Sequence, residues 1–388
     1  MLPVVGTHWL EPLLPEYDKV PAEILEKCDR LHALTVRLDE RLPARTASKV
    51  SGLLATTNSF YSNLIEGQFT EPVEVAVRAP RRTREELYAL AVDHVRAQVF
   101  LERVAERKNL TWDAMFHPRL LSWVHRRIFR GEYDVDSAGV AFRDIDVEVG
   151  DHVAPSHTGV IAMIDRMHEF YGRQRTLHLQ LLSVMAYHHR LAWVHPWSDG
   201  NGRAIRLLTH LQLKRLGMGS GLWSLSRGLA RHQSDYYALL HEADQPRAGA
   251  LDGRGQLTQK GLLRFIDFML NTCLDQVEYT LSALDSDNIR SRLERGLLLA
   301  PQVEGKGIKP EVVRALHSLL TQGRMSRIDF KAFTGLGEKT AQNQLSILIK
   351  LGLVESETPK ARDVTPGLPF WLAEMIFPNL HRRFEIVG

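Results

Sequence analysis

Twelve residues, HPWSDGNGRAIR from His195 to Arg206, combine the residue types that a nucleotide phosphate site needs. Gly200 and Gly202 allow positive φ angles and a close backbone approach, so that amide N–H groups can converge on one anion. A helix that begins near Arg203 would add its N-terminal partial positive charge. Arg203 and Arg206 share one helical face and can both reach phosphate oxygens. We therefore expect a phosphate-binding loop between two helices.

Two further side chains indicate what happens to the bound phosphate. Asp199 offers a hard oxygen ligand beside the anion site, which Mg²⁺ needs when it bridges a carboxylate and a polyphosphate. The imidazole of His195, with an ordinary pKa of about 6.5, can accept a proton from an incoming hydroxyl near neutral pH. We expect ATP or a similar triphosphate as ligand, Mg²⁺ as cofactor at Asp199, and His195 as general base.

The whole segment resembles the motif of the Fic (filamentation induced by cAMP) domain family, His-Pro-Phe-x-Asp/Glu-Gly-Asn-Gly-Arg-x-x-Arg, with Trp197 where Phe is usual. The resemblance implies a protein adenylyltransferase, in which a Ser, Thr or Tyr hydroxyl of a target protein attacks the α-phosphate of ATP and pyrophosphate leaves. The implied targets include the protein itself. By position, it implies an anion hole of Gly200, Asn201 and Gly202, with Arg203 on the α/β-phosphates and Arg206 on the γ-phosphate.

Two other segments carry the resemblance further. RDIDVEVGDHVAP resembles the family's flap, a hairpin that pairs with an extended target segment by adding a strand. The flap residues would be Val147, Glu148, Val149 and Gly150. Tyr236, Tyr237 and Asp244 resemble the family's contacts on the adenine side, although Asn is common where Asp244 stands. The two tyrosines alternatively read as core aromatics.

SNLIEG, from Ser62 to Gly67, resembles the family's inhibitory motif, Ser/Thr-x-x-x-Glu-Gly/Asn, on an N-terminal helix. Ser62 and Glu66 are four residues apart and share one helical face. A carboxylate that reaches Arg206 would occupy the guanidinium that the γ-phosphate needs. The resemblance therefore implies autoinhibition by Glu66.

The elements around these residues predict a mostly α fold. We expect a Fic helical bundle with a short β-hairpin flap, followed by a C-terminal winged helix-turn-helix. The hairpin is predicted within 139–156 by a mostly alternating apolar run. Helical spacing of apolar residues predicts helices over 22–38, 48–67, 84–107, 120–129, 158–171, 177–194, 203–217, 232–244 and 260–284, and a connecting helix over 282–298.

A polar break near residue 308 precedes the C-terminal module. SRIDFKAFTGLGEKTAQNQLSILIKLGLVESE predicts a helix, a tight turn, a second helix and a strand-like edge. Lys339, Gln342, Asn343 and Gln344 on the second helix could read a DNA major groove, and protein contact or dimerisation is equally open. The predicted domains are 1–110, an N-terminal helical region with the inhibitory helix; 111–290, the catalytic core; and 291–388, a linker helix and the winged module.

Composition sets the remaining limits. With 388 residues, 44% hydrophobic and 24% charged, the chain is long enough for more than one globular domain. A net charge of +3 on 49 basic and 46 acidic residues argues against nucleic acid as the dominant partner of the whole molecule. Cys28 and Cys273 fit neither a disulfide framework nor a zinc site. We expect a cytoplasmic protein without a membrane partner, because neither a signal peptide nor a long apolar span is evident.

Several alternatives remain open at this point. A relative with the same glutamate can remove AMP from a modified protein, and the same site can transfer a different nucleotide or a phosphate group. A third alternative is a DNA-binding regulator whose Fic core senses nucleotide without turnover. A homodimer is also compatible with the sequence. His188 and His189 could join His195 in a metal site, but the spacing favours packing of the preceding helix.

Overall fold

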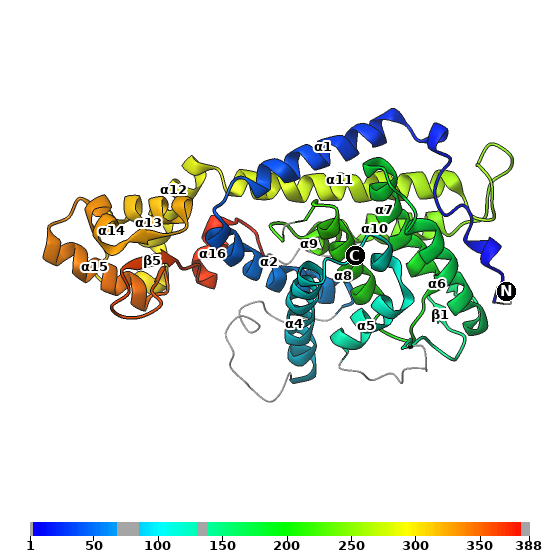
Figure 1. Cartoon of the computed structure of the whole chain (residues 1–388), viewed down its shortest axis with the longest axis horizontal. Coiled ribbons are helices and arrows are strands. Elements are labelled where there is room, and N and C mark those ends of the chain that lie inside the picture. The colour runs from blue at the N-terminus through cyan, green and yellow to red at the C-terminus, as the bar shows by residue number, and fades with distance from the viewer. Residues whose placement is uncertain (1–2, 68–84, 130–138, 220, 382–388) are drawn as a thin grey trace. The chain divides into compact units, whose positions relative to one another are not determined.

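The computed structural model describes residues 3–67, 85–129, 139–219 and 221–381, and these are mostly helical, as predicted (Figure 1). They separate into two compact units. The first unit takes its residues from 1–33, 58–219 and 224–276, and the second from 34–57, 220–223 and 277–388. The predicted boundaries at residues 110 and 290 stay predictions.

The first unit is a helical bundle, apart from one hairpin. Helix α7 packs against α6 and α8, and α5 packs against α4 and α8. Helices α1, α2 and α11 have residues in both units. The helices are α1 (Ala22–Asp39), α2 (Ala44–Ile65), α4 (Glu85–Arg107), α5 (Pro118–Ile128), α6 (His157–Tyr171), α7 (Leu177–Val194), α8 (Asn201–Arg215), α9 (Leu225–Arg231), α10 (Gln233–Ala243) and α11 (Gln259–Ala283), with short 3₁₀ turns at Thr7–Leu10, Tyr17–Lys19 and Asp113–Phe116.

Helix α7 lies in the interior of this unit, because nearly all of its residues from Leu181 to Val194 are buried, the polar His188, His189 and Arg190 included. It begins where the Thr176 hydroxyl accepts the N–H of Leu179 at 3.4 Å. His188 is fully buried, and its ring nitrogens lie 2.7 Å from the Thr209 hydroxyl and 2.8 Å from the Tyr236 hydroxyl. These contacts with α8 and α10 make His188 a hydrogen-bonded core residue.

The hairpin lies within the run that predicted it. Strand β1 (Glu148–Val149) pairs antiparallel with β2 (His152–Val153), and Val149 lies opposite His152. Gly150 in the turn has a φ of 59°, a left-handed value that suits glycine. Only two residue pairs form the ladder, so the hairpin depends on side-chain anchors for its position.

The N-terminal arm of residues 3–21 is part of the core of the first unit. Leu10 and Leu13 are fully buried. The Tyr171 hydroxyl donates to the Leu13 carbonyl at 2.7 Å, and the buried Arg190 donates to the Pro12 carbonyl. The arm is therefore held by buried hydrogen bonds as well as by apolar packing.

In the second unit, the helices α14 and α15 follow each other across a short turn, as the sequence predicted. Gly335 in this turn has a φ of 68°. The three strands form an antiparallel sheet in the order β3, β5, β4. The elements are α12 (Ser286–Leu299), a 3₁₀ turn at Pro301–Val303, α13 (Val312–Gln322), β3 (Met325–Ser326), α14 (Arg327–Thr334), α15 (Glu338–Lys350), β4 (Val354–Glu355), β5 (Asp363–Pro366) and α16 (Phe370–Ile376).

The prediction that Gln344 projects from α15 was wrong. Its side chain is 2% exposed, because the amide donates to the Gly307 carbonyl at 2.9 Å and accepts the Lys309 N–H at 3.0 Å. Lys339, Gln342 and Asn343 are exposed, as predicted. Among the helices of the described residues, none has the combined length and apolarity that a bilayer crossing requires.

Candidate active site

The loop between α7 and α8 turns through two left-handed residues. His195, directly after α7, has φ 51° and ψ 62°, which is uncommon for a residue with a side chain. Its N–H donates to the Leu191 carbonyl at 3.1 Å. Gly200, directly before α8, has a φ of 80°, and an added Cβ would run into the Phe129 ring. The loop therefore needs glycine at 200 and a firm clamp on His195.

That clamp is Arg143, a residue that the sequence did not single out. Its buried guanidinium donates to the His195 carbonyl at 2.8 Å and to the Ile145 carbonyl at 2.8 Å. It also donates to the carbonyls of Val194 and Pro155. One side chain thus ties the end of α7 to the segments on both sides of the flap.

Asn201 and Trp197 lock the middle of the loop. The Asn201 side chain accepts the Trp197 N–H at 3.1 Å and donates to the Trp197 carbonyl at 2.6 Å. The Trp197 ring is fully buried and donates to the Ala141 carbonyl at 2.9 Å. The side chain of Asn201 is therefore a loop brace, and its contribution to an anion hole would come from its backbone N–H.

His125 braces the loop from α5 and was also missed by the sequence. Its ring stacks on Trp197 at a centroid distance of 4.4 Å. Burial lowers the pKa of His125 to about 4, so that the neutral ring donates from Nε2 to the Asp199 carbonyl at 2.9 Å. No local sequence pattern links residue 125 to residue 199.

The start of α8 presents backbone N–H groups at the positive end of the helix. The Ala204 N–H donates to the Gly200 carbonyl at 3.0 Å, and the N–H groups of Asn201 and Gly202 precede it in the first turn. An added Cβ at Gly202 would collide with the Glu66 carboxylate. Glu66 therefore lies at this anion site.

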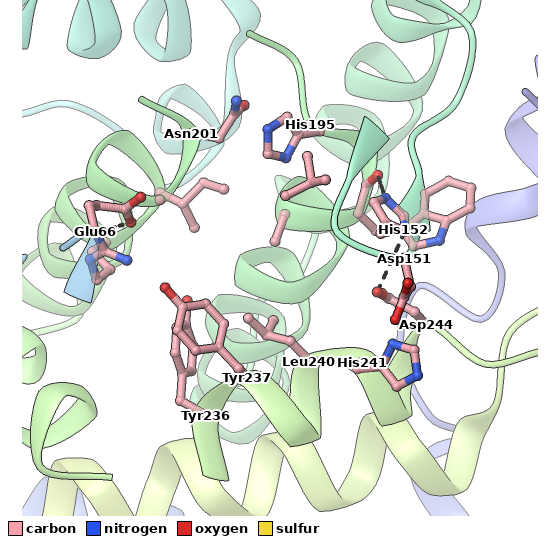
Figure 2. A pocket seen from close by; sticks show the side chains of 16 residues that line it. Glu66, Asp151, His152, His195, Asn201, Tyr236, Tyr237, Leu240, His241 and Asp244 are labelled. Atoms are coloured by element: carbon pink, nitrogen blue, oxygen red, sulfur yellow. Dashed lines mark hydrogen bonds and ion pairs between the residues drawn. The ribbon is translucent and has the colours of Figure 1, made fainter. Parts of the chain in front are cut away.

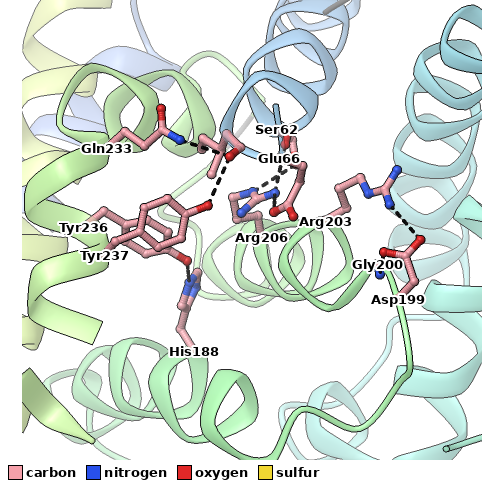
Figure 3. Close-up of polar contacts among 11 residues, drawn as sticks. Ser62, Glu66, His188, Asp199, Gly200, Arg203, Arg206, Gln233, Tyr236 and Tyr237 are labelled. Atoms are coloured by element: carbon pink, nitrogen blue, oxygen red, sulfur yellow. Dashed lines mark hydrogen bonds and ion pairs between the residues drawn. The ribbon is translucent and has the colours of Figure 1, made fainter. Parts of the chain in front are cut away.

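Figure 3 shows the contacts of Arg206 with the C-terminal end of α2 and with Glu66, directly after that helix. Its guanidinium is 1% exposed and lies 2.6 Å from the Glu66 carboxylate. It also donates to the Ser62 hydroxyl at 3.0 Å and to the Ser62 carbonyl at 2.9 Å. Burial acts most strongly, to lower the pKa of Arg206, but Glu66, Tyr236 and Tyr237 together raise the pKa above its ordinary value. The structure thus brings together the three residues that the resemblance paired.

Helix α10 holds the end of α2 in this position. The Ile65 carbonyl, directly before Glu66, accepts from the Gln233 amide at 3.0 Å and from the Tyr237 hydroxyl at 3.1 Å (Figure 3). Tyr236 is 3% exposed and bonded to His188, whereas Tyr237 is 45% exposed. Both tyrosines border the cavity beside Arg206.

Asp199 and Arg203 lie on the other side of the loop. The two side chains are 3.4 Å apart, and Arg203 also lies 4.5 Å from the centre of the Phe129 ring. The Asp199 side chain is 79% exposed. In the described part of the chain, no three His, Cys, Asp or Glu side chains converge as metal ligands. Mg²⁺ usually takes one or two protein carboxylates and keeps several waters, so a single exposed carboxylate beside an anion site suits it.

These elements surround a cavity of about 300 Å³ (Figure 2). Its walls include His195 and Arg206, the first and last residues of the predicted motif, so both face the same cavity. The predicted residues that line it are Glu66, Val149, His195, Asn201, Gly202, Arg206, Tyr236, Tyr237 and Asp244, and those outside its walls are Ser62, Val147, Glu148, Gly150, Asp199, Gly200 and Arg203.

The ionisation of His195 follows from its surroundings. Burial lowers the pKa of His195 to about 4, and the nearby His152 contributes in the same direction. The imidazole is consequently neutral at pH 7 and has a lone pair for a proton. A neutral base, a buried arginine and a helix N-terminus thus face one cavity, an arrangement suited to proton abstraction beside a bound phosphate.

At the far end of the cavity, Asp244 lies between two histidines. Its carboxylate is 3.0 Å from His189 Nε2 and 3.6 Å from His152 Nδ1. His152, on strand β2, also lies 2.8 Å from the Trp193 carbonyl. His189 is therefore a polar core residue, and His152 is a cavity residue that the sequence did not identify.

Known proteins resemble this chain over the segment that contains the site. Residues 116–213 match the model of the Fic/DOC family. "Protein adenylyltransferase Fic" of Nematostella vectensis is 25% identical over 240 residues, which are 60% of this chain and 52% of that protein. Proteins of the same name from Culex quinquefasciatus and Drosophila persimilis are 31% and 35% identical over 31% and 24% of this chain, and 23% and 18% of their own length. The chain thus spans about half or less of these relatives.

Solved structures share the fold. A Fic family protein from Desulfovibrio desulfuricans G20 is similar with a TM-score of 0.53 and 17% identity, over 92% of this chain and 98% of that one. Fic-1 from C. elegans is similar with a TM-score of 0.50 and 17% identity, over 69% of this chain and 74% of that one. These similarities, at 17% identity, show the fold, and the match to the Fic/DOC family model covers residues 116–213.

Proposed function

We propose that this chain is a protein adenylyltransferase that transfers AMP from ATP to hydroxyl side chains of proteins, itself included. The Fic/DOC domain and the names of its distant relatives support this class of reaction. The observation that carries the proposal is that His195, Arg206 and the N-terminus of α8 face one cavity. A base and a polyphosphate site are the two parts that the reaction requires.

The proposed reaction is a displacement at phosphorus. Neutral His195 accepts the proton of a target hydroxyl, and the hydroxyl oxygen bonds to the α-phosphorus of ATP. The bond from the α-phosphorus to the β-phosphate oxygen breaks, so that AMP stays on the target and pyrophosphate leaves. The left-handed turn at His195, clamped by Arg143, fixes the imidazole where the hydroxyl must approach.

The polyphosphate would lie along the start of α8. The N–H groups of Asn201 and Gly202 would donate to its oxygens at the helix end, and Arg206 would bind the γ-phosphate. Asp199 would hold Mg²⁺, which when bound neutralises charge on the polyphosphate and on the departing pyrophosphate. Its exposed side chain leaves room for the waters that Mg²⁺ retains.

We further propose that Glu66 restrains this reaction. Its carboxylate occupies the guanidinium of Arg206 and lies against Gly202, so it takes the place of a phosphate group at both contacts. Two anions cannot share this site without strong repulsion. ATP would then bind without its γ-phosphate on Arg206, in a geometry unsuited to attack on the α-phosphorus.

The flap is the proposed target contact. Val149 lines the cavity and is 45% exposed, and Glu148 beside it is exposed. A segment that adds as a third strand to this short hairpin would bring its hydroxyl to the cavity that contains His195. The target is therefore expected to present Ser, Thr or Tyr in an extended stretch.

The position of the label in ATP tests the reaction class. The Glu66→Gly variant with Mg²⁺ and α-labelled ATP should label protein, and γ-labelled ATP should not. Label from the γ position would instead identify phosphate transfer. Protein that carries label from neither position would overturn both forms of transfer.

Removal of AMP is the second candidate, because Glu66 itself lines the cavity and can orient a water molecule. Protein that carries labelled AMP, prepared with Glu66→Gly, would serve as substrate. Release of AMP by the wild-type chain but not by Glu66→Gly would support hydrolysis. Retention of the label with both would exclude it.

For the C-terminal unit we propose a winged helix-turn-helix, supported by the succession of α14 and α15 and by the β3–β5–β4 sheet. Lys339, Gln342 and Asn343 form an exposed face of α15 that suits a DNA groove. Salt-dependent retention of duplex DNA that is weakened by Lys339→Ala but not by His195→Ala would support it. Equal retention by all three proteins would contradict a DNA contact on α15.

A further inference from the structure

Four polar side chains form one continuous chain of contacts from the N-terminal arm to the flap. Arg190 donates to the Pro12 carbonyl from Nε at 3.2 Å and from Nη2 at 2.8 Å, and from Nη1 to His189 Nδ1 at 2.7 Å. His189 then contacts Asp244. Asp244 in turn contacts His152 (Figure 2). We call Arg190, His189, Asp244 and His152 the flap relay.

Arg190 fixes the proton on His189. A guanidinium has only donors, so His189 Nδ1 must accept and the ring proton lies on Nε2. Burial lowers the pKa of His189, which keeps the ring neutral. His189 Nε2 lies 3.0 Å from Asp244 Oδ1 and 3.1 Å from the Leu240 carbonyl. The carboxylate is thereby oriented, with Oδ2 toward the flap.

His152 receives this carboxylate on strand β2. Its Nε2 lies 2.8 Å from the Trp193 carbonyl, which only accepts, so Nε2 carries a proton. Its Nδ1 faces Asp244 Oδ2 at 3.6 Å. Other ionisable groups that line the same cavity are His195 at the end of α7, Asp151 in the hairpin turn, His241 on α10 and Glu66 after α2.

We propose that the flap relay is a positioning device that holds β2, and Val149 across from it, at the rim of the cavity. The hairpin has two residue pairs and one further backbone bond, from the Ala154 N–H to the Val147 carbonyl, and a ladder of that length does not keep its position by backbone pairing alone. Arg143 holds the segments on either side of the hairpin, at Ile145 and Pro155, but not the two strands themselves. Asp244 acts through His152 in this account and is a positioning residue. The role of the flap in target binding rests on the proposed function. The claim that the relay holds the flap in position does not.

Hydrogen exchange of the backbone amides in 147–154 tests the relay on the full chain without ATP or target. Asp244→Ala should speed exchange of these amides about tenfold. Asp244→Asn should stay near the wild type, because its amide oxygen still accepts from His189 and its NH₂ takes the place of Oδ2 beside His152 Nδ1. Asp235→Ala, an exposed change on the same helix and outside the cavity walls, should change nothing.

A second variant guards against a folding defect in Asp244→Ala. His152→Phe cuts the relay from the flap side, and it should speed the same amides while exchange in α6 stays unchanged. Flap exchange equal to the wild type in both variants would overturn the proposal. Exchange in Asp244→Asn as fast as in Asp244→Ala would also overturn it. So would weaker ATP binding by Asp244→Ala without a change in flap exchange, because Asp244 would then be a nucleotide contact. Amide exchange is measured without catalysis. A protein without enzymatic activity would therefore count against AMP transfer, but the exchange result would still test the flap relay.

Discussion

The Glu66 carboxylate lies 2.6 Å from the Arg206 guanidinium and touches the position where a Cβ on Gly202 would stand. One carboxylate therefore occupies two of the positions at which a polyphosphate would be recognised. Ser62, one turn earlier on α2, completes the hold on Arg206 through its hydroxyl and its carbonyl. The restraint proposed here is thus shared between two residues.

Ser62→Ala should weaken the restraint without removing it. The substitution deletes one acceptor of the buried Arg206, while the Glu66 contact and the Ser62 carbonyl remain. We expect AMP transfer to rise a few-fold and the free energy of unfolding to fall by about 1 kcal/mol. Initial rates with α-labelled ATP and urea denaturation measure the two effects, and an unchanged rate with lowered stability would assign Ser62 to folding alone.

Arg143→Lys should lower kcat more than KM for ATP. Lysine keeps the charge, but a single ammonium cannot reach the carbonyls of His195, Val194 and Ile145 together, so the left-handed turn loosens. We expect kcat to fall by a factor of about 10². Arg173→Lys, at an exposed position in the turn after α6, is the matched control. Full activity of Arg143→Lys would show that the clamp is dispensable.

The acid limb of the pH profile should lie well below neutrality. A base is active when unprotonated, and the pKa of His195 is lowered to about 4 by burial. The kcat/KM of Glu66→Gly should therefore stay level from pH 8 to about pH 5 and fall near pH 4. An acid limb near pH 6.5 would mean that His195 titrates as an exposed imidazole.

Stability should also fall as the pH is lowered from 6.5 toward 4. Burial lowers the pKa of His94 and His188 to about 3 and that of His125 to about 4, whereas the unfolded chain binds protons at its ordinary pKa of about 6.5. The unfolded state therefore takes up more protons in this window, and the folded state loses at least about 1 kcal/mol per histidine. Urea midpoints at pH 7 and pH 5 measure this, and equal midpoints would contradict it.

The local parts of the site could be predicted from the sequence because their chemistry is contiguous. The phosphate loop, its two flanking helices and the hairpin each arise from neighbouring residues. The Ser62–Glu66 segment is also contiguous, but only its resemblance to an inhibitory motif joined it to Arg206. Helical periodicity could not make that connection.

The residues that the sequence missed act over long separations. Arg143 binds the carbonyl of residue 195, His125 binds that of residue 199, and His152 meets Asp244. No pattern of spacing marks such pairs, since each depends on packing between distant elements. Gln344 was misjudged for the same reason, because its position on α15 suits exposure while the 307–309 backbone covers it.

The most direct test of AMP transfer compares Glu66→Gly with the double variant Glu66→Gly/His195→Ala, using Mg²⁺ and α-labelled ATP. Glu40→Gly, an exposed glutamate that also follows a helix end, controls for the substitution itself. We predict protein-bound label at least about tenfold above wild type in Glu66→Gly, at wild-type level in Glu40→Gly, and absent from the double variant. Label that persists without His195, or no label on any protein, would contradict the account.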